Sequence, residues 1–185
     1  MERHPDGQDQ VLNLEELTES FEPIVGQSVA LRTLRREDVD IEAAFLTGLS
    51  AESRHNRLLG GMIRITREYV EKLTTVDYSR DMALAAVLMI EDREVLIGVA
   101  RYVLEPEGRA CEFALVIADA WQGRGIGRRM MEKLIAVARG RGLERIYGDV
   151  LAMNRPMLAF CNRLGFTLSR HPDDPTVTRA TLDLC

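Results

Sequence analysis

The sequence predicts a single mixed α/β domain built around one central sheet. A chain of 185 residues, of which 46% are hydrophobic and 29% charged, is long enough to bury a core of its own. The apolar run from Met82 to Ile90 fits a central strand covered on both faces, and it is far shorter than the roughly 20 residues of a membrane-spanning helix. The glycine-rich segment 122–127 separates a further apolar strand from an amphipathic helix.

The first half of the chain is expected to form one strand, three helices and then three strands. Val39, Ala43 and Leu46 recur at spacings of four and three residues, which is typical of a helix. Ser50 and Thr66 are residue types that favour the N-cap position, and each precedes a further predicted helix. The expected elements are a strand at 29–34, helices at 37–49, 51–58 and 67–74, and strands at 82–90, 94–104 and 110–118.

The second half is expected to alternate helices and strands. Asn154-Arg155-Pro156 predicts a helix start, because proline is tolerated in the first turn, where its missing N–H would have no partner. The helix after the glycine-rich segment has an apolar residue at every fourth position, namely Ile126, Met130, Leu134 and Ala138. The expected elements are helices at 126–141 and 154–164 and strands at 143–150, 166–170 and 176–184.

Acidic side chains are concentrated at the N-terminus. Residues 1–27 contain seven acidic residues and one arginine, whereas residues 28–185 carry a formal net charge of +1. We therefore expect an acidic, flexible arm at 1–27 and one folded domain at 28–185. A near-neutral domain lacks the concentrated basic face that binding to nucleic-acid phosphates requires, so nucleic acid is not an expected partner.

Cysteine and histidine are sparse and widely separated. Cys111, Cys161 and Cys185 form neither a disulfide framework nor a CxxC pair, and the three histidines are equally scattered, so no metal site is expected. The N-terminus has no apolar segment of the kind that marks a secretory signal. These features predict a protein of the reducing cytoplasm that has no membrane partner.

The glycine-rich segment predicts an anion-binding turn. Gly123, Gly125 and Gly127 allow positive φ angles and let a ligand approach the main chain closely. The first N–H groups of the following helix have no partner within the helix and lie at the positive end of its dipole. A diphosphate placed there would accept several charge-assisted hydrogen bonds. A glycine turn that enters a helix without any ligand is the alternative.

The arginines of this segment also favour an anion. Arg124, Arg128 and Arg129 lie in the turn and the first helical turn, where the dipole disfavours cations unless an anion is bound. Two known phosphate loops are excluded. The P-loop requires Gly-Lys-Ser/Thr at the helix start, where Gly127 is followed by Arg128, and the dinucleotide fingerprint requires a third glycine where Arg128 stands.

Two motifs of the sequence resemble those of the GNAT superfamily of N-acyltransferases. Gln122, Gly125 and Gly127, which follow an apolar strand and precede an amphipathic helix, match the acetyl-CoA motif Q/R-x-x-G-x-G/A of that superfamily. Asn154, followed eleven residues later by Gly165-Phe166, matches its second motif, a helix that begins with Asn and ends in Leu-Gly-Phe.

This resemblance implies a fold and a cosubstrate. The implied fold is the GNAT fold, an α/β architecture with a mixed, mostly antiparallel central sheet flanked by helices. Its sheet splays between two neighbouring strands, which here are the strands near 110–118 and 143–150. The implied cosubstrate is acetyl-CoA, from which the enzyme transfers an acetyl group to an amine.

Further segments resemble the acetyltransferase module of bacterial protein lysine acetyltransferases of the Pat type. The closer resemblance implies a protein lysine as the acceptor. A small-molecule amine as acceptor and a non-catalytic module that senses acyl-CoA are the alternatives. The segments that carry the resemblance are 49–54, 73–84, 99–102, 111–114 and 154–158.

Direct attack by an amine requires a general base, for which Glu112 is the candidate. Pat-type enzymes carry the base on the strand that leads into the cofactor loop, and Glu112 lies on that strand. A carboxylate between Cys111 and Phe113 would be partly desolvated, so its pKa should rise towards neutrality. A solvated charge near the start of a strand is the alternative interpretation, and Asp149 on the strand 143–150 is the second candidate base.

The resemblance also implies which residues bind the cofactor. Main-chain groups near Val116 and Ile117 are expected to contact the pantetheine arm and to polarise the thioester carbonyl. Asn154 is expected to bond the same arm, although capping its own helix accounts for it equally well. The expected cofactor-binding residues are Val116, Ile117, Gln122, Gly123, Arg124, Gly125, Ile126, Gly127, Arg128 and Asn154.

The sequence leaves the general acid open. The family often places a tyrosine four residues before the glycine of the Leu-Gly-Phe turn, and this chain has Cys161 there. A thiol could donate a proton, but a small buried side chain is the simpler interpretation. Tyr78, Tyr102 and Tyr147 cannot be ranked as donors from the sequence.

Overall fold

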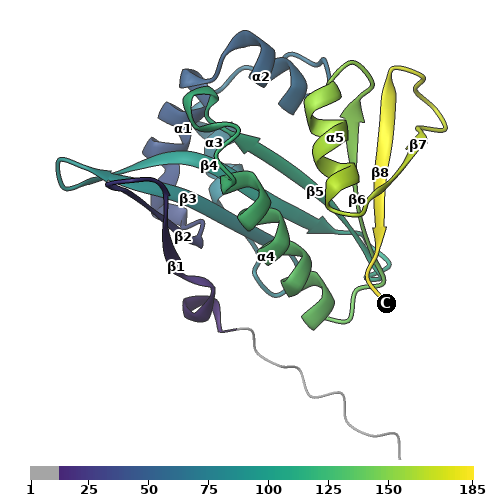
Figure 1. The fold of residues 1–185 in the computed structure, drawn as a ribbon, viewed down its shortest axis with the longest axis horizontal. Helices are drawn as coiled ribbons and strands as arrows, with labels where there is room; N and C mark the ends of the chain where they lie inside the picture. The colour runs from purple at the N-terminus through teal and green to yellow at the C-terminus, as the bar shows by residue number, and fades with distance from the viewer. Residues whose placement is uncertain (1–12) are drawn as a thin grey trace, which may run out of the picture.

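The computed structural model describes residues 13–185 and contains one eight-stranded sheet (Figure 1). The strand order is β1-β2-β3-β4-β5-β6-β8-β7, and all neighbours are antiparallel except β5 and β6, which are parallel. The strands are β1 (Glu19–Ile24), β2 (Gln27–Thr33), β3 (Met82–Ile90), β4 (Arg93–Leu104), β5 (Ala110–Ile117), β6 (Arg145–Leu151), β7 (Thr167–Arg170) and β8 (Val177–Asp183). The helices are α1 (Val39–Gly48), α2 (Ala51–Arg57), α3 (Arg67–Thr74), α4 (Ile126–Gly140) and α5 (Arg155–Arg163), with short 3-10 helices η1 (Leu14–Leu17), η2 (Arg36–Asp38) and η3 (Asp119–Trp121).

Strand β3 carries the core on both of its faces, as predicted. Because side chains alternate along a strand, Leu84 and Ala86 pack into the hydrophobic layer beneath α4, whereas Ala83 and Ala85 pack into the layer formed with α1 and α3. Figure 1 shows α4 and α5 in front of the sheet and α1 behind it. The sheet is therefore the middle of three layers.

The sheet splays between β5 and β6, as the family resemblance implies. The two strands pair only from Ala110 opposite Arg145 to Glu112 opposite Tyr147, although β5 continues to Ile117. Phe113 stands where the pairing ends and its ring packs edge-on against Phe166. A Cβ at Gly148 would approach the Phe113 ring to 2.6 Å, so only glycine leaves room for this ring between the diverging strands.

The predicted helix starts are confirmed. Ser50, Thr66 and Asn154 each accept a hydrogen bond from the main-chain N–H three residues ahead, at 3.1–3.2 Å. Helix α4 begins directly after Gly125, whose φ of 81° would strain any other residue type. The predicted apolar row of α4 is buried against the sheet, with Ile126, Met130, Leu134 and Ala138 at 0–1% exposure.

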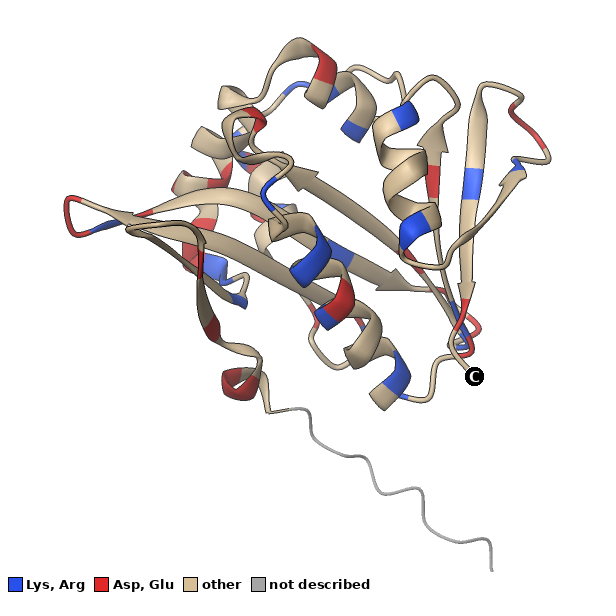
Figure 2. Ribbon diagram, in the orientation of Figure 1, with Lys and Arg blue, Asp and Glu red and all other residues tan. Residues whose placement is uncertain are grey.

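The N-terminal segment differs from the flexible arm expected at 1–27. Glu19–Ile24 form β1, which pairs with β2, so the folded domain begins before residue 28. Glu19 forms ion pairs with Lys133 at 3.1 Å and with Arg129 at 3.5 Å, both on α4. Figure 2 shows acidic residues in red on η1 and β1, and mainly basic residues in blue on α4. The charge count missed these partners because they lie far along the chain. Residues 1–12 lie outside the described residues.

Candidate functional site

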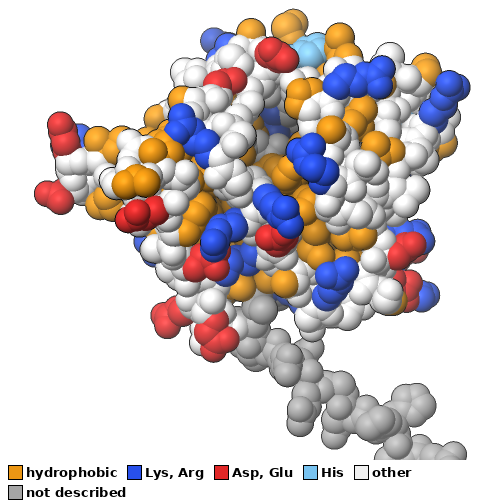
Figure 3. All heavy atoms as spheres, in the orientation of Figure 1, with side chains coloured by type: hydrophobic (Ala, Val, Ile, Leu, Met, Phe, Trp, Pro, Cys, Tyr) orange, Lys and Arg blue, Asp and Glu red, His pale blue; other side chains and the backbone are white. Residues whose placement is uncertain are grey.

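A cleft of about 600 Å³ opens where β5 and β6 diverge. Its walls come from α2, the C-terminal half of β5, the start of α4, β6 and α5. Figure 3 shows this hollow, with hydrophobic side chains on its floor and Lys and Arg side chains along its margin. The predicted site residues that line it are Glu112, Val116, Ile117, Gln122, Gly123, Gly125, Gly127, Arg128 and Asn154.

The start of α4 presents unpaired N–H groups to the cleft. The first main-chain bond of the helix runs from the Arg129 N–H to the Gly125 carbonyl at 3.1 Å. The main-chain N–H groups of residues 125–128 have no acceptor within residues 13–185. Gly123 at φ 72° and Gly125 at φ 81° shape the turn that exposes them, and no Cβ obstructs the approach of a ligand. This geometry suits an anion.

The arginines around this turn are not equivalent. Arg128 lines the cleft and pairs with Glu132 at 2.7 Å, one turn further along α4. Arg129 turns away towards β1, where it stacks on Phe21. Arg124 lies 5.2 Å from the centre of the Trp121 ring and does not line the cleft. Of the three arginines that the sequence singled out, the structure brings only Arg128 to the cleft.

The side chains of two further predicted residues, Gln122 and Ile126, pack or bond within the protein. Gln122 donates from Nε2 to the Ile117 carbonyl at 3.0 Å and to Ser53 Oγ at 3.2 Å, which ties the turn to the end of β5 and to α2. Ile126 is 1% exposed beneath α4, so only its main chain is available to a ligand. The Gln122 side-chain amide therefore holds the glycine turn against β5 and α2.

An unpredicted network joins α2 to the same turn. Asp119 accepts hydrogen bonds from the Ser50 N–H at 2.9 Å and from both the Ser50 and Ser53 hydroxyls at 2.7 Å. These bonds, the Ser50 N–H foremost, hold the pKa of Asp119 below its usual range. The N-cap at Ser50 was the one local signal of this network, and it did not identify Asp119 as the distant partner.

Odd-numbered residues of β5 present their main-chain N–H and carbonyl groups to the opening between β5 and β6. The Ala118 N–H donates to the Ile97 carbonyl of β4 at 2.8 Å, whereas the Ile117 carbonyl points the other way, to Gln122. Main-chain groups of successive strand residues point to opposite edges. The main-chain groups of Val116 therefore face β4, and those of Leu115 and Ile117 face the opening.

Glu112 lies at the narrow end of the cleft, at the last paired position of β5 and β6. Its carboxylate is exposed on the cleft side. Burial of the rest of the side chain raises its pKa, and the negative charge of Asp149 raises it further, while Arg179 and Arg57 oppose the shift. The direction of this shift agrees with the sequence-based expectation.

The carboxylate of the second candidate base, Asp149, already has hydrogen-bond partners. Asp149 accepts two hydrogen bonds from Arg179, at 2.8 and 2.9 Å, and lies 3.4 Å from His171 Nε2. The bidentate pair with Arg179 therefore occupies both carboxylate oxygens of Asp149. The geometry therefore favours Glu112 over Asp149.

No candidate proton donor among the described residues lines the cleft, although Tyr147 lies opposite Glu112 in the pairing of β5 and β6. Cys161 is fully buried, and burial raises the pKa of its thiol to about 11. Tyr78 donates to the Ala83 carbonyl, and Tyr102 accepts from Arg141 at 2.7 Å. Burial, together with a hydrogen bond to Glu105, raises the pKa of Tyr147. None of these four described side chains lines the cleft.

Sequence reasoning missed the wall that α2 contributes. Glu52, Asn56 and Arg57 of α2 line the cleft, as do Phe160 and Arg163 of α5. A signal was present in α2, whose seven residues include no large apolar side chain. A helix with no apolar face gains little free energy by burial against the core, so such a helix is expected at the surface or at the edge of a cleft.

Within residues 13–185, no group of His, Cys, Asp or Glu side chains is arranged to hold a metal ion. The same part of the chain has no helix with the length and apolar character needed to cross a membrane. The three cysteines are free.

Comparison with known proteins identifies the family. The acetyltransferase (GNAT) family profile matches residues 59–166. An acetyltransferase of Pseudomonas aeruginosa is 40% identical over 152 residues, which cover 82% of this chain and 81% of that protein. The acetyltransferase Pat of Mycolicibacterium smegmatis is 30% identical over 141 residues, 76% of this chain and 41% of that protein.

A solved structure gives the same answer. The crystal structure of the GNAT domain of S. lividans PAT superposes with a TM-score of 0.80 at 26% identity, covering 91% of this chain and 98% of that one. The GNAT fold expected from the two sequence motifs is thereby confirmed. The chain belongs to the GNAT family, and it is an acetyl-CoA-dependent N-acetyltransferase.

Proposed function

We propose that the acceptor is a protein lysine and that Glu112 is the general base. The observation that carries the proposal is the position of Glu112, at the narrow end of a cleft that also contains the start of α4. The similarity to two Pat proteins supports a lysine acceptor. We place the reaction in the cytoplasm, because the free cysteines fit a reducing compartment.

The cosubstrate fits the cleft in two places. The N–H groups of residues 125–128 would hold the diphosphate, with Ile126 contributing through its main chain and Arg128 adding a positive charge. The opening between β5 and β6 would take the pantetheine arm, with Asn154 at its side. We assign the polar contacts along β5 to Leu115 and Ile117, because the main chain of Val116 faces β4.

Glu112 would remove the proton that makes the lysine unreactive. An unperturbed lysine has a pKa of about 10.4, so at pH 7 only about one amine in 2,500 is neutral. When acetyl-CoA is bound, it supplies a thioester whose carbonyl carbon the amine attacks. The new C–N bond replaces the C–S bond, Glu112 takes the amine proton directly or through a water, and the leaving thiolate takes a proton from solvent in the open cleft.

Acetylation of defined acceptors tests this function. The purified enzyme is incubated with radiolabelled acetyl-CoA and either lysine peptides or a panel of small amines. We expect label on the lysine ε-amine, and a loss of labelling in the Glu112→Gln variant at pH 7. Labelling of small amines alone would replace the protein acceptor by a metabolite, and unchanged activity of the variant would refute Glu112 as the base.

A further inference from the structure

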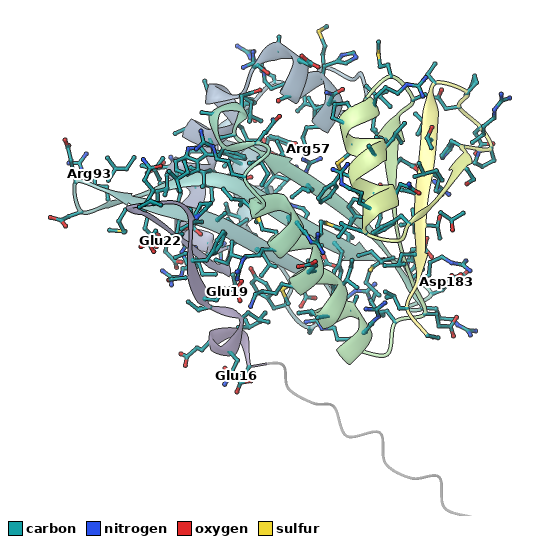
Figure 4. All side chains as sticks on the ribbon, in the orientation of Figure 1. Glu16, Glu19, Glu22, Arg57, Arg93 and Asp183 are labelled. Atoms are coloured by element: carbon teal, nitrogen blue, oxygen red, sulfur yellow. The ribbon has the colours of Figure 1, made fainter. Side chains whose placement is uncertain are left out.

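Arg57, the last residue of α2, is a partly buried cation on the wall of the cleft. Figure 4 shows the labelled Arg57 in the interior between α2 and α5, whereas the labelled Arg93, Asp183 and Glu16 lie at the periphery. Arg57 also lines a small apolar cavity beside the cleft, whose other lining residues include Leu46, Leu49, Leu58, Ile65 and Tyr69. A residue shared by both cavities can rest its aliphatic stem on the apolar one and present its guanidinium to the cleft.

The guanidinium of Arg57 forms no ion pair and no hydrogen bond within residues 13–185, although its charge acts on the carboxylates of Glu42 and Glu112. Three nearby arginines each have a partner: Arg54 donates to the Thr47 carbonyl at 3.1 Å, Arg101 to the Leu73 carbonyl at 3.0 Å and Arg179 to Asp149. An arginine that is partly withdrawn from water and unpartnered is ready to bind a planar anion in bidentate geometry.

The diphosphate of the cosubstrate is not that anion. Helix α4 packs over the face of the sheet that carries Leu115 and Ile117, because Gly127 lies against both of these side chains. Glu112 alternates with them and points to the opposite face, and the Arg57 charge acts directly on its carboxylate. Arg57 therefore belongs with the base, on the side from which the amine must enter.

We propose that Arg57 binds a carboxylate of the acceptor that lies close to the reacting amine. In a protein acceptor this group is an Asp or Glu side chain next to the target lysine, and in a free amino acid it would be the α-carboxylate. The inference deepens the proposed function and rests on it. It makes Arg57 a specificity-determining residue on the acceptor side of the cleft.

The bound carboxylate would also improve the base. The charged groups that act on Glu112 are Asp149 and Arg179 from β6 and β8, Glu105 after β4, and Arg57 from α2. Arg57 opposes the raised pKa of Glu112, and a carboxylate paired with Arg57 cancels much of that effect. The pKa of Glu112 then lies closer to neutrality when the correct acceptor is bound, which favours proton transfer at pH 7.

Matched peptides test the inference. Lysine peptides with Asp at one position from two before to two after the lysine are compared with the same peptides carrying Asn. Because a hydrogen bond to a charged group is worth a factor of roughly ten or more, we expect at least about a tenfold higher kcat/KM for the best Asp peptide. Nα-acetyl-lysine and its amide form a second pair, in which a preference for the acid would identify an α-carboxylate as the source.

Variants at Arg57 separate recognition from folding. Arg57→Gln should reduce the Asp/Asn ratio to about one, through a loss of kcat/KM for the Asp peptide. Arg57→Glu should reverse the preference towards peptides with Lys in place of Asp, a gain that an unfolded protein cannot show. Arg64→Gln, an exposed arginine that lines neither cavity, is the matched control and should change nothing.

The outcomes distinguish this inference from the function on which it rests. Acetylation of lysine peptides without any carboxylate preference, or a preference that survives in Arg57→Gln, would refute the role of Arg57 and leave the lysine acceptor standing. No acetylation of any lysine substrate would remove the proposed function and this inference with it.

Discussion

Replacement of Glu112 by glutamine tests the proposed chemistry with little change in shape. General-base catalysis contributes about 10²- to 10⁴-fold, and the full penalty of using a protonated lysine at pH 7 is about 4.6 kcal/mol, or a factor of about 2,500. The Glu112 carboxylate is exposed on its cleft side, so water can replace it in part. We therefore expect kcat/KM at pH 7 to fall by about 10²- to 10³-fold, measured by release of free thiol from acetyl-CoA.

The pH profile separates a base from a structural residue. The Glu112→Gln variant can use only acceptor amine that is already neutral. Its kcat/KM should therefore rise about tenfold per pH unit from pH 7. The wild type should rise only until Glu112 is ionised, and the two enzymes should differ by less than about tenfold at pH 10. A rate ratio of wild type to variant that stays constant with pH would show that Glu112 is not the base. Glu107→Gln, in the exposed turn before β5, is the matched control.

The same variant makes a prediction about stability. The folded protein holds the Glu112 proton more tightly than the unfolded chain, because burial and Asp149 raise this pKa. The free energy of unfolding of the wild type therefore loses a contribution as pH rises from about 4.5 through the folded pKa. Glu112→Gln should be more stable than the wild type at pH 7, and the gain should vanish at pH 4. Denaturant titration at both pH values measures it.

Three further substitutions address the rest of the site. Arg179→Gln removes a cation that opposes the raised pKa of Glu112, so the acidic limb of the kcat/KM profile should move to higher pH, and a move to lower pH would contradict the assignment. Gly125→Ala forces an L-residue to φ 81°, at a cost of about 1–2 kcal/mol, and should weaken acetyl-CoA binding in calorimetry more than Gly127→Ala, whose Cβ meets only side-chain atoms, of Leu115 at 3.3 Å and of Ile117 at 3.6 Å. Cys161→Ala should keep kcat within about twofold while lowering Tm, because the thiol is fully buried with a pKa of about 11, and a tenfold loss of kcat would make it the proton donor.

The sequence predicted the parts of the fold whose signals are local. The β3 run, the N-caps at Ser50 and Thr66, and the glycine turn before α4 each depend on residues within a few positions of one another. The splay between β5 and β6 was anticipated only through the family resemblance. The contact of the Phe113 ring with Gly148 at the point of divergence joins positions that no local pattern connects.

The features that the sequence did not predict depend on contacts between segments that are distant in the chain. Residues 19–24 were expected to be part of an arm because the partners of Glu19 lie far along the chain, on α4. Asp149 was a reasonable second base until Arg179 was placed opposite it across β6 and β8. The direction of main-chain groups along β5, which turns Val116 away from the opening, follows from the pairing of β5 with β4, a strand that is distant from the glycine turn in local sequence pattern.

A crystal structure of the enzyme with coenzyme A would show whether the start of α4 binds the diphosphate. We expect diphosphate oxygens at about 2.7–3.2 Å from main-chain nitrogens of residues 125–128, and a pantetheine arm that enters between β5 and β6 beside Leu115 and Ile117. A diphosphate bound elsewhere, or an arm that does not reach towards Glu112, would contradict this expectation.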